Sequence, residues 1–267
     1  MPSDIRQFIA PVVKTKEIIP DHHVLTFNAP FLAETARPGH FVNVLAAEGF
    51  DPLLRKPFSV YTVDRDSGDV SILFSIVGPT TRAMAQKRPG DTIDLVGPLG
   101  DRLFRPDTRS GTLHVMVGGG YGVPPLVFLA NELRIADPEI DLFFIIGARH
   151  DGLLLCEAEL RAAHIATTVS TENGSRGVRG RVTDVLLPLL EENANRPLTV
   201  YCCGPTPMMR AVGDLCLSRE VPCQLSVEVR MPCGVGVCMA CVIDLTDGRR
   251  VRCCTDGPVF EAGEVVW

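Results

Sequence analysis

The sequence predicts a β plus α/β multidomain chain with three parts: an N-terminal antiparallel β-barrel over residues 1–104, a doubly wound parallel α/β domain over residues 105–228, and a small C-terminal segment over residues 229–267. Three observations support this division. Short apolar runs separated by glycine and proline fill the first part, and strand-like and helix-like stretches alternate in the second. Closely spaced cysteines fill the third.

The overall composition disfavours several classes of protein. The chain has 267 residues and a formal net charge of −6, so there is no electrostatic reason to expect nucleic-acid binding. Its first twenty residues carry early charges of both signs, which is not the pattern of a signal peptide. No apolar run approaches the length of a membrane-spanning helix. We therefore expect a cytoplasmic protein whose ten cysteines are thiols or ligands more often than disulfides.

The first part is predicted to be a small barrel. Strand-like runs lie at 24–27, 41–44 and 70–74, and one helical stretch at 81–87 interrupts them. The segment 54–61, LRKPFSVY, combines two cations, an aromatic ring and a hydroxyl. Cations can hold a pyrophosphate, and a serine hydroxyl can hydrogen-bond the edge of a flavin ring. An ordinary surface strand explains the same residues when the segment is considered alone.

The second part contains two turns that favour a nucleotide. GGGYG, residues 118–122, joins a buried strand at 113–117 to a helical stretch at 125–133, and CGP, residues 203–205, follows another strand at 198–202. In a doubly wound sheet both turns lie at the carboxyl ends of strands, where ligands bind. The first turn departs from the G-x-G-x-x-G pattern, so tight packing turns are the alternative. Further strands are predicted at 141–147, 167–171 and 224–227.

Two other loops of this part are candidates for contacts with the same ligand. The glycine-rich loop 171–180 could touch a ribose or a phosphate, although a plain surface loop is the alternative, and Thr183 or Asp184 could cap the helix after it. The choice between NAD and NADP stays open. Arg149 could meet a 2′-phosphate, whereas Asp151 argues for the unphosphorylated ribose.

The third part carries the most specific signal. Cys233, Cys238 and Cys241 have the spacing C-x4-C-x2-C, and a fourth thiol follows at Cys253 or Cys254. This is the ligand pattern of a plant-type [2Fe–2S] cluster. A strand at 242–245, a turn at 246–248 and a returning strand at 249–253 would bring the fourth thiol back. Adjacent residues of an extended chain point to opposite faces, so one of the two is expected to be a ligand. A zinc site, a disulfide pair or buried thiols are the alternatives.

Taken in order, these motifs resemble the ferredoxin–NADP reductase superfamily over nearly the whole chain. Within it, they are similar to the iron–sulfur electron-transfer subunits of NAD-dependent dihydroorotate dehydrogenases. The motifs that carry the resemblance are DPLLRKPFSVY, GDTIDLVGPLG, VGGGYGVPPL, STENGSRGVRGRVTDVL, YCCGPTPMM, EVRMPCGVGVCMACVI and CCTDGPVF. In such subunits the fourth ligand stands just before a dipeptide ending in Asp, then Gly-Pro-Val-Phe, which corresponds to Cys254 here and leaves Cys253 as a bystander.

The resemblance implies FAD, one [2Fe–2S] cluster and NAD+ as cofactors of an oxidoreductase subunit. It implies FAD contacts from Arg55, Lys56, Pro57, Phe58, Ser59, Leu73, Phe74, Ser75, Thr80 and Thr81. It implies NAD contacts from Gly118, Gly119, Gly120, Gly122, Cys203, Gly204 and Pro205, with Cys203 near the nicotinamide or simply packed. The cluster ligands would be Cys233, Cys238, Cys241 and Cys254.

Two positions depart from the family's pattern. Lys56 stands where relatives have arginine, so the bidentate fork is lost and Arg55 could share the phosphate contact. Thr80 stands where relatives have glycine, so Thr80 is a weaker candidate than Thr81.

The resemblance also implies a partner and a pathway. The partner would be an FMN-containing dihydroorotate dehydrogenase catalytic subunit, in a heterotetramer of two plus two, and the pathway de novo pyrimidine (UMP) biosynthesis. Two alternatives remain. One is a flavin and iron–sulfur module serving a hydrogenase, a sulfite reductase or a ferredoxin-linked transhydrogenase. The other is a zinc-stabilised binding module without redox activity.

Overall fold

The computed structural model describes residues 5–46 and 54–267. The chain divides into two compact units, and residues 229–267 contribute to both. The first unit comprises Met1–Leu103, Val229–Ile243 and Val251–Pro258, and the second comprises Phe104–Glu228, Asp244–Arg250 and Val259–Trp267. The domain limits inferred from the sequence stay a prediction. Among the described residues, no helix has the length and apolar character needed to cross a membrane.

The first unit is built on an antiparallel seven-stranded sheet in the order β4-β3-β7-β1-β2-β6-β5. Its strands are β1 (Arg6–Ile19), β2 (His22–Asn28), β3 (Phe41–Leu45), β4 (Lys56–Ser59), β5 (Thr62–Asp64), β6 (Asp69–Ser75) and β7 (Thr92–Leu99). Phe58 of the end strand β4 packs edge-to-face on Phe74 of β6, with ring centroids 5.9 Å apart. This contact joins strands near opposite ends of the strand order, and the predicted antiparallel barrel is confirmed.

The longest strand of the barrel is β1, which the sequence did not reveal. Its first half pairs with β7 and its second half with β2, so it lies at the middle of the strand order. Only Ala10 and Val12 of its fourteen residues are buried, so the strand has no clear apolar pattern. The three predicted strands are confirmed within β2, β3 and β6. Two short helices, α1 (Pro30–Thr35) and α2 (Pro79–Ala85), complete the unit, and α2 begins two residues before the predicted stretch.

The second unit holds a seven-stranded sheet in the order β11-β10-β9-β8-β12-β13-β16. All its strand pairs are parallel except β13 with β16. The strands are β8 (Leu113–Gly119), β9 (Asp141–Ala148), β10 (Ala166–Thr171), β11 (Val178–Arg179), β12 (Leu198–Cys203), β13 (Cys223–Ser226) and β16 (Val259–Glu261). The predicted parallel α/β domain is confirmed.

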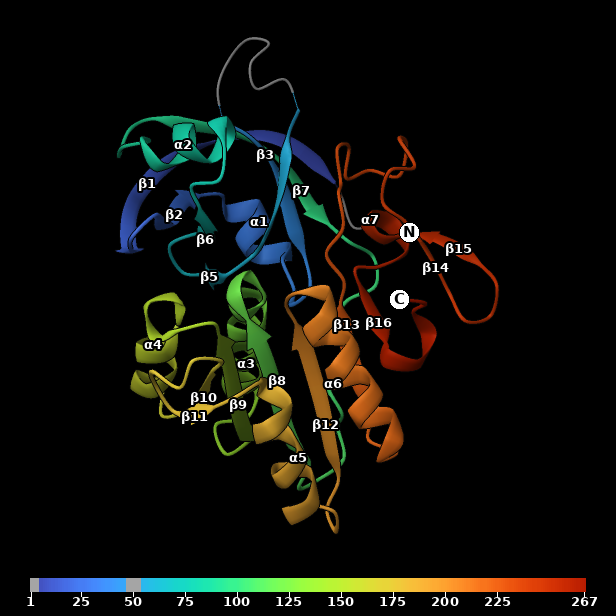
Figure 1. The fold of residues 1–267 in the computed structure, drawn as a ribbon. Coiled ribbons are helices and arrows are strands. Elements are labelled where there is room, and N and C mark those ends of the chain that lie inside the picture. Colours follow the sequence, from blue (N-terminus) through green and yellow to red (C-terminus); the bar gives the residue numbers. More distant parts are fainter. Residues whose placement is uncertain (1–4, 47–53) are drawn as a thin grey trace. The chain divides into compact units, whose positions relative to one another are not determined.

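The helices of this unit show that the sheet is doubly wound. They are α3 (Val123–Ala136), α4 (Glu157–Ala162), α5 (Val182–Glu192) and α6 (Thr206–Ser218), with the short turns η1 (Gly120–Gly122) and η2 (Asp151–Leu153). Figure 1 shows α5 and α6 side by side, and these two helices are in contact. The connections β8–α3–β9 and β12–α6–β13 leave in opposite directions, so right-handed crossovers place α3 and α6 on opposite faces. The neighbours β8 and β12 therefore form the topological switch point.

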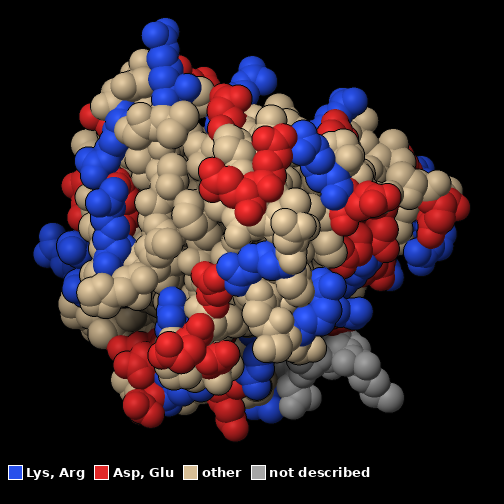
Figure 2. Space-filling model, turned by 90° about the horizontal axis from the view of Figure 1, so that it is seen from below, with Lys and Arg blue, Asp and Glu red and all other residues tan. Residues whose placement is uncertain are grey.

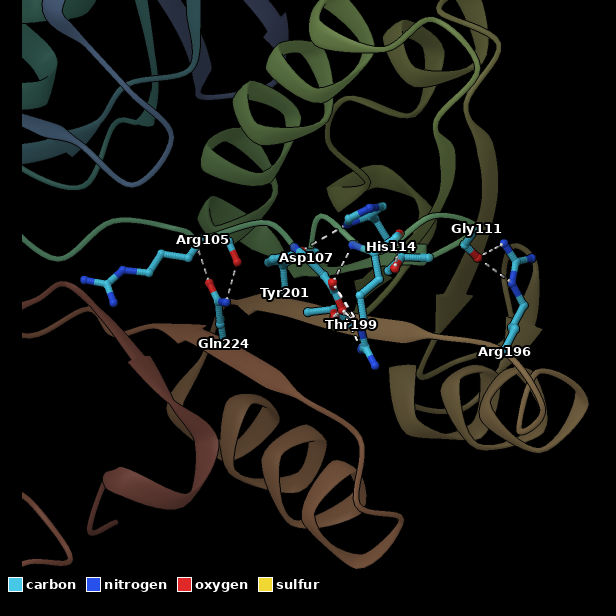
Figure 3. A network of polar contacts seen from close by, with 10 residues as sticks. Arg105, Asp107, Gly111, His114, Arg196, Thr199, Tyr201 and Gln224 are labelled. Atoms are coloured by element: carbon cyan, nitrogen blue, oxygen red, sulfur yellow. Dashed lines mark hydrogen bonds and ion pairs between the residues drawn. The ribbon is translucent and has the colours of Figure 1, made fainter.

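A polar network fixes the segment that enters the second unit (Figure 3). The side-chain amide of Gln224 accepts from the Arg105 N–H at 2.9 Å and donates to the Arg105 carbonyl at 2.7 Å. The Tyr201 hydroxyl accepts from the Asp107 N–H at 3.2 Å and lies 3.0 Å from His114 Nδ1. Burial raises the pKa of Tyr201, so the hydroxyl keeps its proton, and burial lowers the pKa of the neighbouring His114.

The cysteine segment ends in a hairpin and a helical turn. The hairpin strands are β14 (Val242–Asp244) and β15 (Arg250–Arg252), and Gly248 adopts a positive φ of 85° in the predicted turn between them. The prediction that the returning strand reaches Cys253 is wrong, because α7 (Cys253–Asp256) begins there, and η3 (Ala262–Glu264) follows β16. Cys253 and Cys254 are therefore helical rather than extended, so their side chains do not lie on opposite faces of a strand.

On the face drawn in Figure 2, basic and acidic side chains are interspersed over the surface. This mixture agrees with the modest net charge of −6.

Candidate functional site

The four predicted cluster cysteines form two pairs within the first unit. The Sγ atoms of Cys241 and Cys254 lie 3.2 Å apart. The backbone N–H of Cys238 points at the Sγ of Cys233, with an N–S distance of 3.5 Å. The loop that carries the first three thiols turns through Gly234 and Gly236, whose φ angles of +70° and +79° favour glycine.

The electrostatic environments of the two pairs differ. Burial raises the pKa of Cys233, but N–H groups of Cys238, Val235 and Val237 outweigh it and lower that pKa to about 6. Burial, followed by the hydrogen bond and charge of Cys241, raises the pKa of Cys254 to about 12. A bound cation reverses the second effect, because it stabilises both thiolates at once.

The two cysteine pairs match the way in which a two-iron cluster divides its ligands. Within residues 5–46 and 54–267, no group of three or more His, Cys, Asp or Glu side chains is gathered around one metal position. A [2Fe–2S] cluster divides its four thiolates between two irons, which is the grouping that two cysteine pairs supply. Cys238 is exposed while Cys241 and Cys254 are buried, so one end of the candidate site reaches the surface.

The segment around Cys254 is anchored to the barrel by backbone bonds. The Gly257 carbonyl accepts from the N–H groups of Asp101 and Arg102 at 3.0 and 2.9 Å. The Cys253 N–H donates to the Cys241 carbonyl at 2.9 Å. Thus the residues that directly follow GDTIDLVGPLG bind the CCTDGPVF motif, which lies far away in the sequence.

The candidate flavin residues lie on two strands that meet. Pro57, Phe58 and Ser59 belong to β4, and the buried residues Leu73, Phe74 and Ser75 belong to β6. The Phe58–Phe74 contact brings these strands together. The first three residues of the DPLLRKPFSVY motif, 51–53, lie outside the described residues. Lys56 opens β4 and is exposed, so its ammonium group is accessible to a phosphate.

Other candidate flavin side chains already have partners. Arg55 binds Asp94 of β7, with its guanidinium 2.6 Å from the carboxylate and 3.1 Å from the carbonyl. The Thr81 hydroxyl caps α2, accepting from the N–H groups of Val77 and Gly78 at 2.9 and 3.2 Å. Thr80 is buried beside it. Arg55 and Thr81 thus shape the site through protein contacts.

The candidate NAD residues meet at the switch point between β8 and β12. A Cβ atom added to Gly122 would lie 2.0 Å from the Cys203 carbonyl oxygen, and one added to Gly204 would lie 3.0 Å from the Gly119 carbonyl oxygen. The glycines therefore allow the two turns to touch. The helices α3 and α6 begin directly after these turns, and helix N-termini favour a phosphate.

Cys203 is a buried thiol at this point. Its own burial, and then the charge of Glu228, raise the pKa of Cys203 to about 12. The group is therefore a neutral thiol near pH 7, which fits packing better than nucleophilic chemistry.

The loops after β9 and β10 form one structure. The Glu172 N–H donates to the Ala148 carbonyl at 3.1 Å, and the Asp151 N–H donates to the Ser175 hydroxyl at 2.9 Å. Asp184 caps α5 from its third position by accepting from the Arg181 N–H at 2.8 Å. Arg149 and Asp151 both belong to this loop pair, which leaves the NAD-or-NADP choice open.

Two residues near the candidate flavin and cluster segments were missed. Asn43 of β3 donates from Nδ2 to the Cys233 carbonyl at 2.8 Å. His23 of β2 stacks on Phe74, with ring centroids 5.8 Å apart. A polar residue inside the apolar run FVNVL was the available signal for Asn43.

Comparison with known proteins matches the cysteine segment and the nucleotide-binding sheet separately. Residues 228–266 match the family described as the iron–sulfur cluster binding domain of dihydroorotate dehydrogenase B, and residues 116–214 match the oxidoreductase NAD-binding domain. Both predicted domain types are confirmed. One solved structure is that of an NADH-dependent reduced ferredoxin-NADP oxidoreductase, described in connection with flavin-based electron bifurcation. It aligns with a TM-score of 0.82 and 29% identity, and the alignment covers 97% of this chain and 90% of that one.

Curated relatives match over nearly their full length. The protein of Desulforamulus reducens is 34% identical over 97% of this chain and 98% of its own, and that of Bacillus caldolyticus is 40% identical over 91% of each. Both are named dihydroorotate dehydrogenase B (NAD(+)), electron transfer subunit. The resemblance seen in the motifs is thereby confirmed. The chain belongs to the family of dihydroorotate dehydrogenase B (NAD+) electron transfer subunits.

Proposed function

We propose that this chain passes electrons from an FMN-containing dihydroorotate dehydrogenase catalytic subunit to NAD+, in de novo UMP biosynthesis in the cytoplasm. The observation that carries the proposal is the presence, in one chain, of the two cysteine pairs, the barrel strands β4 and β6 and the β8–β12 switch point, in a family of this name. The cluster exchanges single electrons, whereas FAD exchanges one or two and so connects it to a two-electron acceptor.

Four thiolates hold the [2Fe–2S] cluster, as two pairs. Cys241 and Cys254 form the buried pair, and Cys233 and Cys238 form the pair that opens to the surface. Backbone N–H groups directed at Cys233 Sγ stabilise negative charge there. The Gly257 carbonyl bonds to Asp101 and Arg102 keep Cys254 in reach of Cys241.

FAD lies against β4 and β6 of the barrel. Lys56 offers the cation for the pyrophosphate, since Arg55 is engaged by Asp94. Ser59 and the strand edges offer hydrogen bonds to the ring system, and Phe58, Leu73 and Phe74 offer apolar surface. The capped N-terminus of α2 at Thr80 and Thr81 completes the candidate set.

NAD+ lies at the carboxyl ends of β8 and β12. Gly118 to Gly122 let the pyrophosphate approach the backbone and the start of α3. Gly204 and Pro205 lead into α6 on the other side of the switch point. Cys203 contributes a neutral thiol to the wall of this site.

The catalytic subunit docks over the loop 233–241, in a heterotetramer of two plus two. Two apolar side chains of this loop are strongly exposed, Val237 at 77% and Met239 at 58%, and they flank Cys238. Exposed apolar side chains grouped around a redox site suit a protein interface. A partner bound here brings its own cofactor near the exposed cysteine pair.

A second candidate function rests on the solved structure with a TM-score of 0.82. The similarity to that structure favours the alternative that this chain is a module of a ferredoxin-linked transhydrogenase, which would need the same flavin and cluster. The identities of 34% and 40% to the electron transfer subunits, against 29% to that structure, favour the first candidate.

Co-expression with the catalytic subunit tests the proposal. The purified complex is expected to reduce NAD+ with dihydroorotate as electron donor, and the catalytic subunit alone is expected not to do so. Co-purification with a nickel or haem subunit, together with no dihydroorotate-dependent NADH formation, would contradict it. A colourless protein containing zinc after anaerobic purification would exclude both redox candidates.

A further inference from the structure

Asn43 is a fully buried polar residue inside an apolar strand. Its neighbours Val42 and Val44 are 0% exposed, and so is Asn43 itself. Placing an amide side chain in such a position costs free energy unless its polar atoms are hydrogen-bonded. Among the described residues, the side chain of Asn43 makes one hydrogen bond, from Nδ2 to the carbonyl oxygen of Cys233 at 2.8 Å.

The other polar atom of this amide is unsatisfied. Asn43 Oδ1 is buried and has no hydrogen-bond partner among the described residues. Turning the amide over would bring Oδ1 against the Cys233 oxygen, so the Cys233 carbonyl fixes the orientation. A half-satisfied buried amide is a poor choice for barrel stability alone, because an apolar residue would fill the site at lower cost. Its presence therefore points to a requirement at Cys233.

The bond fixes the beginning of the cysteine loop. Cys233 is the first of the four cysteines, and its Sγ receives the N–H of Cys238 across the loop. A Cβ atom added to Gly234 would lie 2.3 Å from Asn43 Nδ2, so the absence of a side chain there lets the loop approach β3. Asn43 and Gly234 thus form a close contact between strand and loop.

The strand that holds this contact also pairs with the candidate flavin strand. In the β3–β4 ladder Asn43 stands opposite Pro57, and in the β3–β7 ladder it stands opposite Val96. One residue therefore touches the cysteine loop through its side chain and borders the flavin segment through its backbone.

We propose that Asn43 is a positioning residue that holds the backbone of Cys233 and thereby sets the retention and the reduction potential of the cluster. This inference rests on the proposed function, because it requires a cluster at these cysteines. Hydrogen bonds to cluster sulfurs stabilise the more negative, reduced state. When the Cys233 carbonyl is released, the loop loosens and the N–H groups directed at its sulfur move away. Reduction then becomes less favourable, and iron is lost more easily.

The test compares two asparagines that differ in what they hold. Asn43→Leu removes the bond to Cys233 with little change of volume. Asn28→Leu is the control, because Asn28 on β2 also donates from Nδ2 to a backbone carbonyl, that of Ser67, at 2.8 Å, and its other partner is the Asp69 carboxylate, at 2.8 Å. Each variant is purified anaerobically as the complex. The measurements are the cluster midpoint potential by EPR-monitored titration, the rate of iron release to a chelator, and the FAD content.

Asn43→Leu is expected to shift the midpoint potential to a more negative value and to release iron roughly fivefold faster, a factor typical of one lost hydrogen bond. FAD content is expected to stay at the wild-type level, and Asn28→Leu is expected to match the wild type in potential and iron release. Equal potentials and release rates in Asn43→Leu and Asn28→Leu would overturn the inference.

A second variant with a smaller side chain, Asn43→Ser, tests whether the effects of Asn43→Leu arise from misfolding. Asn43→Ser adds no bulk, and its short side chain does not reach the Cys233 carbonyl, so the same two changes are expected. If neither Asn43 variant accumulates as a flavoprotein while Asn28→Leu does, Asn43 serves the barrel itself and the inference fails. A wild-type protein without a [2Fe–2S] signal would instead contradict the proposed function, which keeps the two failures distinct.

Discussion

At the scale of single residues, the adjacent cysteines 253 and 254 use the same partner in different ways. The thiol of Cys254 lies 3.2 Å from the Cys241 thiol, whereas the backbone N–H of Cys253 donates to the Cys241 carbonyl. The helical turn α7 separates the two side chains by roughly 100° around its axis. One residue therefore presents a side chain to Cys241, and the other secures its backbone.

Replacing these two cysteines separately tests the ligand assignment. We expect Cys254→Ser to lose the cluster, because a hydroxyl is a poor substitute for a thiolate ligand. We expect Cys253→Ser to retain it, with some loss of stability from the buried hydroxyl. Iron content and the visible spectrum after anaerobic purification measure both. The reverse pattern would assign the fourth ligand to Cys253.

A buried histidine gives the barrel a pH-dependent stability. His40 is 4% exposed, and its Nδ1 accepts from the Arg37 N–H at 2.9 Å. Burial and then the charge of Arg37 lower the pKa of His40 to about 4, against a smaller opposing contribution from a backbone hydrogen bond to Gly100. The unfolded chain takes up this proton near pH 6.5, so stability is full above that pH and falls as the pH drops toward 4.

The expected size is a loss of about 2 kcal/mol of unfolding free energy from this group between pH 7 and pH 5. Asn at position 40 does not titrate, so His40→Asn is expected to be less stable at pH 7 but less sensitive to acid. Denaturant unfolding at both pH values measures the difference. An unchanged, wild-type pH dependence in His40→Asn would refute the assignment.

At the scale of elements, the two turns at the switch point depend on each other. Gly122 follows β8 and its missing side chain makes room for the Cys203 carbonyl after β12. Gly122→Ala places a Cβ against that oxygen and pushes the turns apart. Because such overpacking costs about 1–3 kcal/mol, we expect NADH to bind roughly tenfold more weakly. FAD and iron contents should be unchanged.

The control for this prediction is Gly213→Ala in α6, where an added Cβ would meet Ala262 at 3.3 Å. Titration with NADH, followed through the flavin absorbance, measures NADH binding to both variants. If Gly122→Ala binds NADH as tightly as Gly213→Ala, the turns do not form a common site.

The elements also show what could be predicted and what could not. The buried strands β8, β9 and β12 were predicted because continuous apolar runs between turns leave few alternatives. The strand β1 was missed because its partners β2 and β7, not its own pattern, keep it extended. The helical turn α7 has four residues, too few for a periodic signal.

The parts of the candidate site that depend on one residue type could be predicted from the sequence. The parts that depend on a contact with a residue far away in the sequence could not. Cysteine spacing located the cluster segment, since thiolates are its ligands. The engagement of Arg55 by Asp94, 39 residues away, is a tertiary contact without a local signature. The same holds for Asn43 and Cys233, which are 190 residues apart.

At the scale of the whole molecule, the loop 233–241 is the proposed docking surface for the catalytic subunit. Val237→Asp places a charge in the apolar centre of that interface, where unpaired charges are costly, and we expect at least about tenfold weaker association. Analytical ultracentrifugation of the mixed subunits measures it. Ile135→Asp, at an isoleucine 72% exposed in α3, should associate normally. Normal association of Val237→Asp would move the interface elsewhere.

The chain passes between its two units at five points, near residues 103, 228, 243, 250 and 258. The nucleotide unit is thus inserted into the unit that carries the flavin strands and the cysteines, rather than appended to it. Because of this insertion, neither unit can be cut out for protein engineering as one continuous fragment. A fragment ending at residue 103 has no cysteine, and a fragment beginning at 229 has no barrel strand to receive Cys233. Transplanting the electron-carrying unit would require closing two gaps with linkers, one between residues 103 and 229 and one between residues 243 and 251.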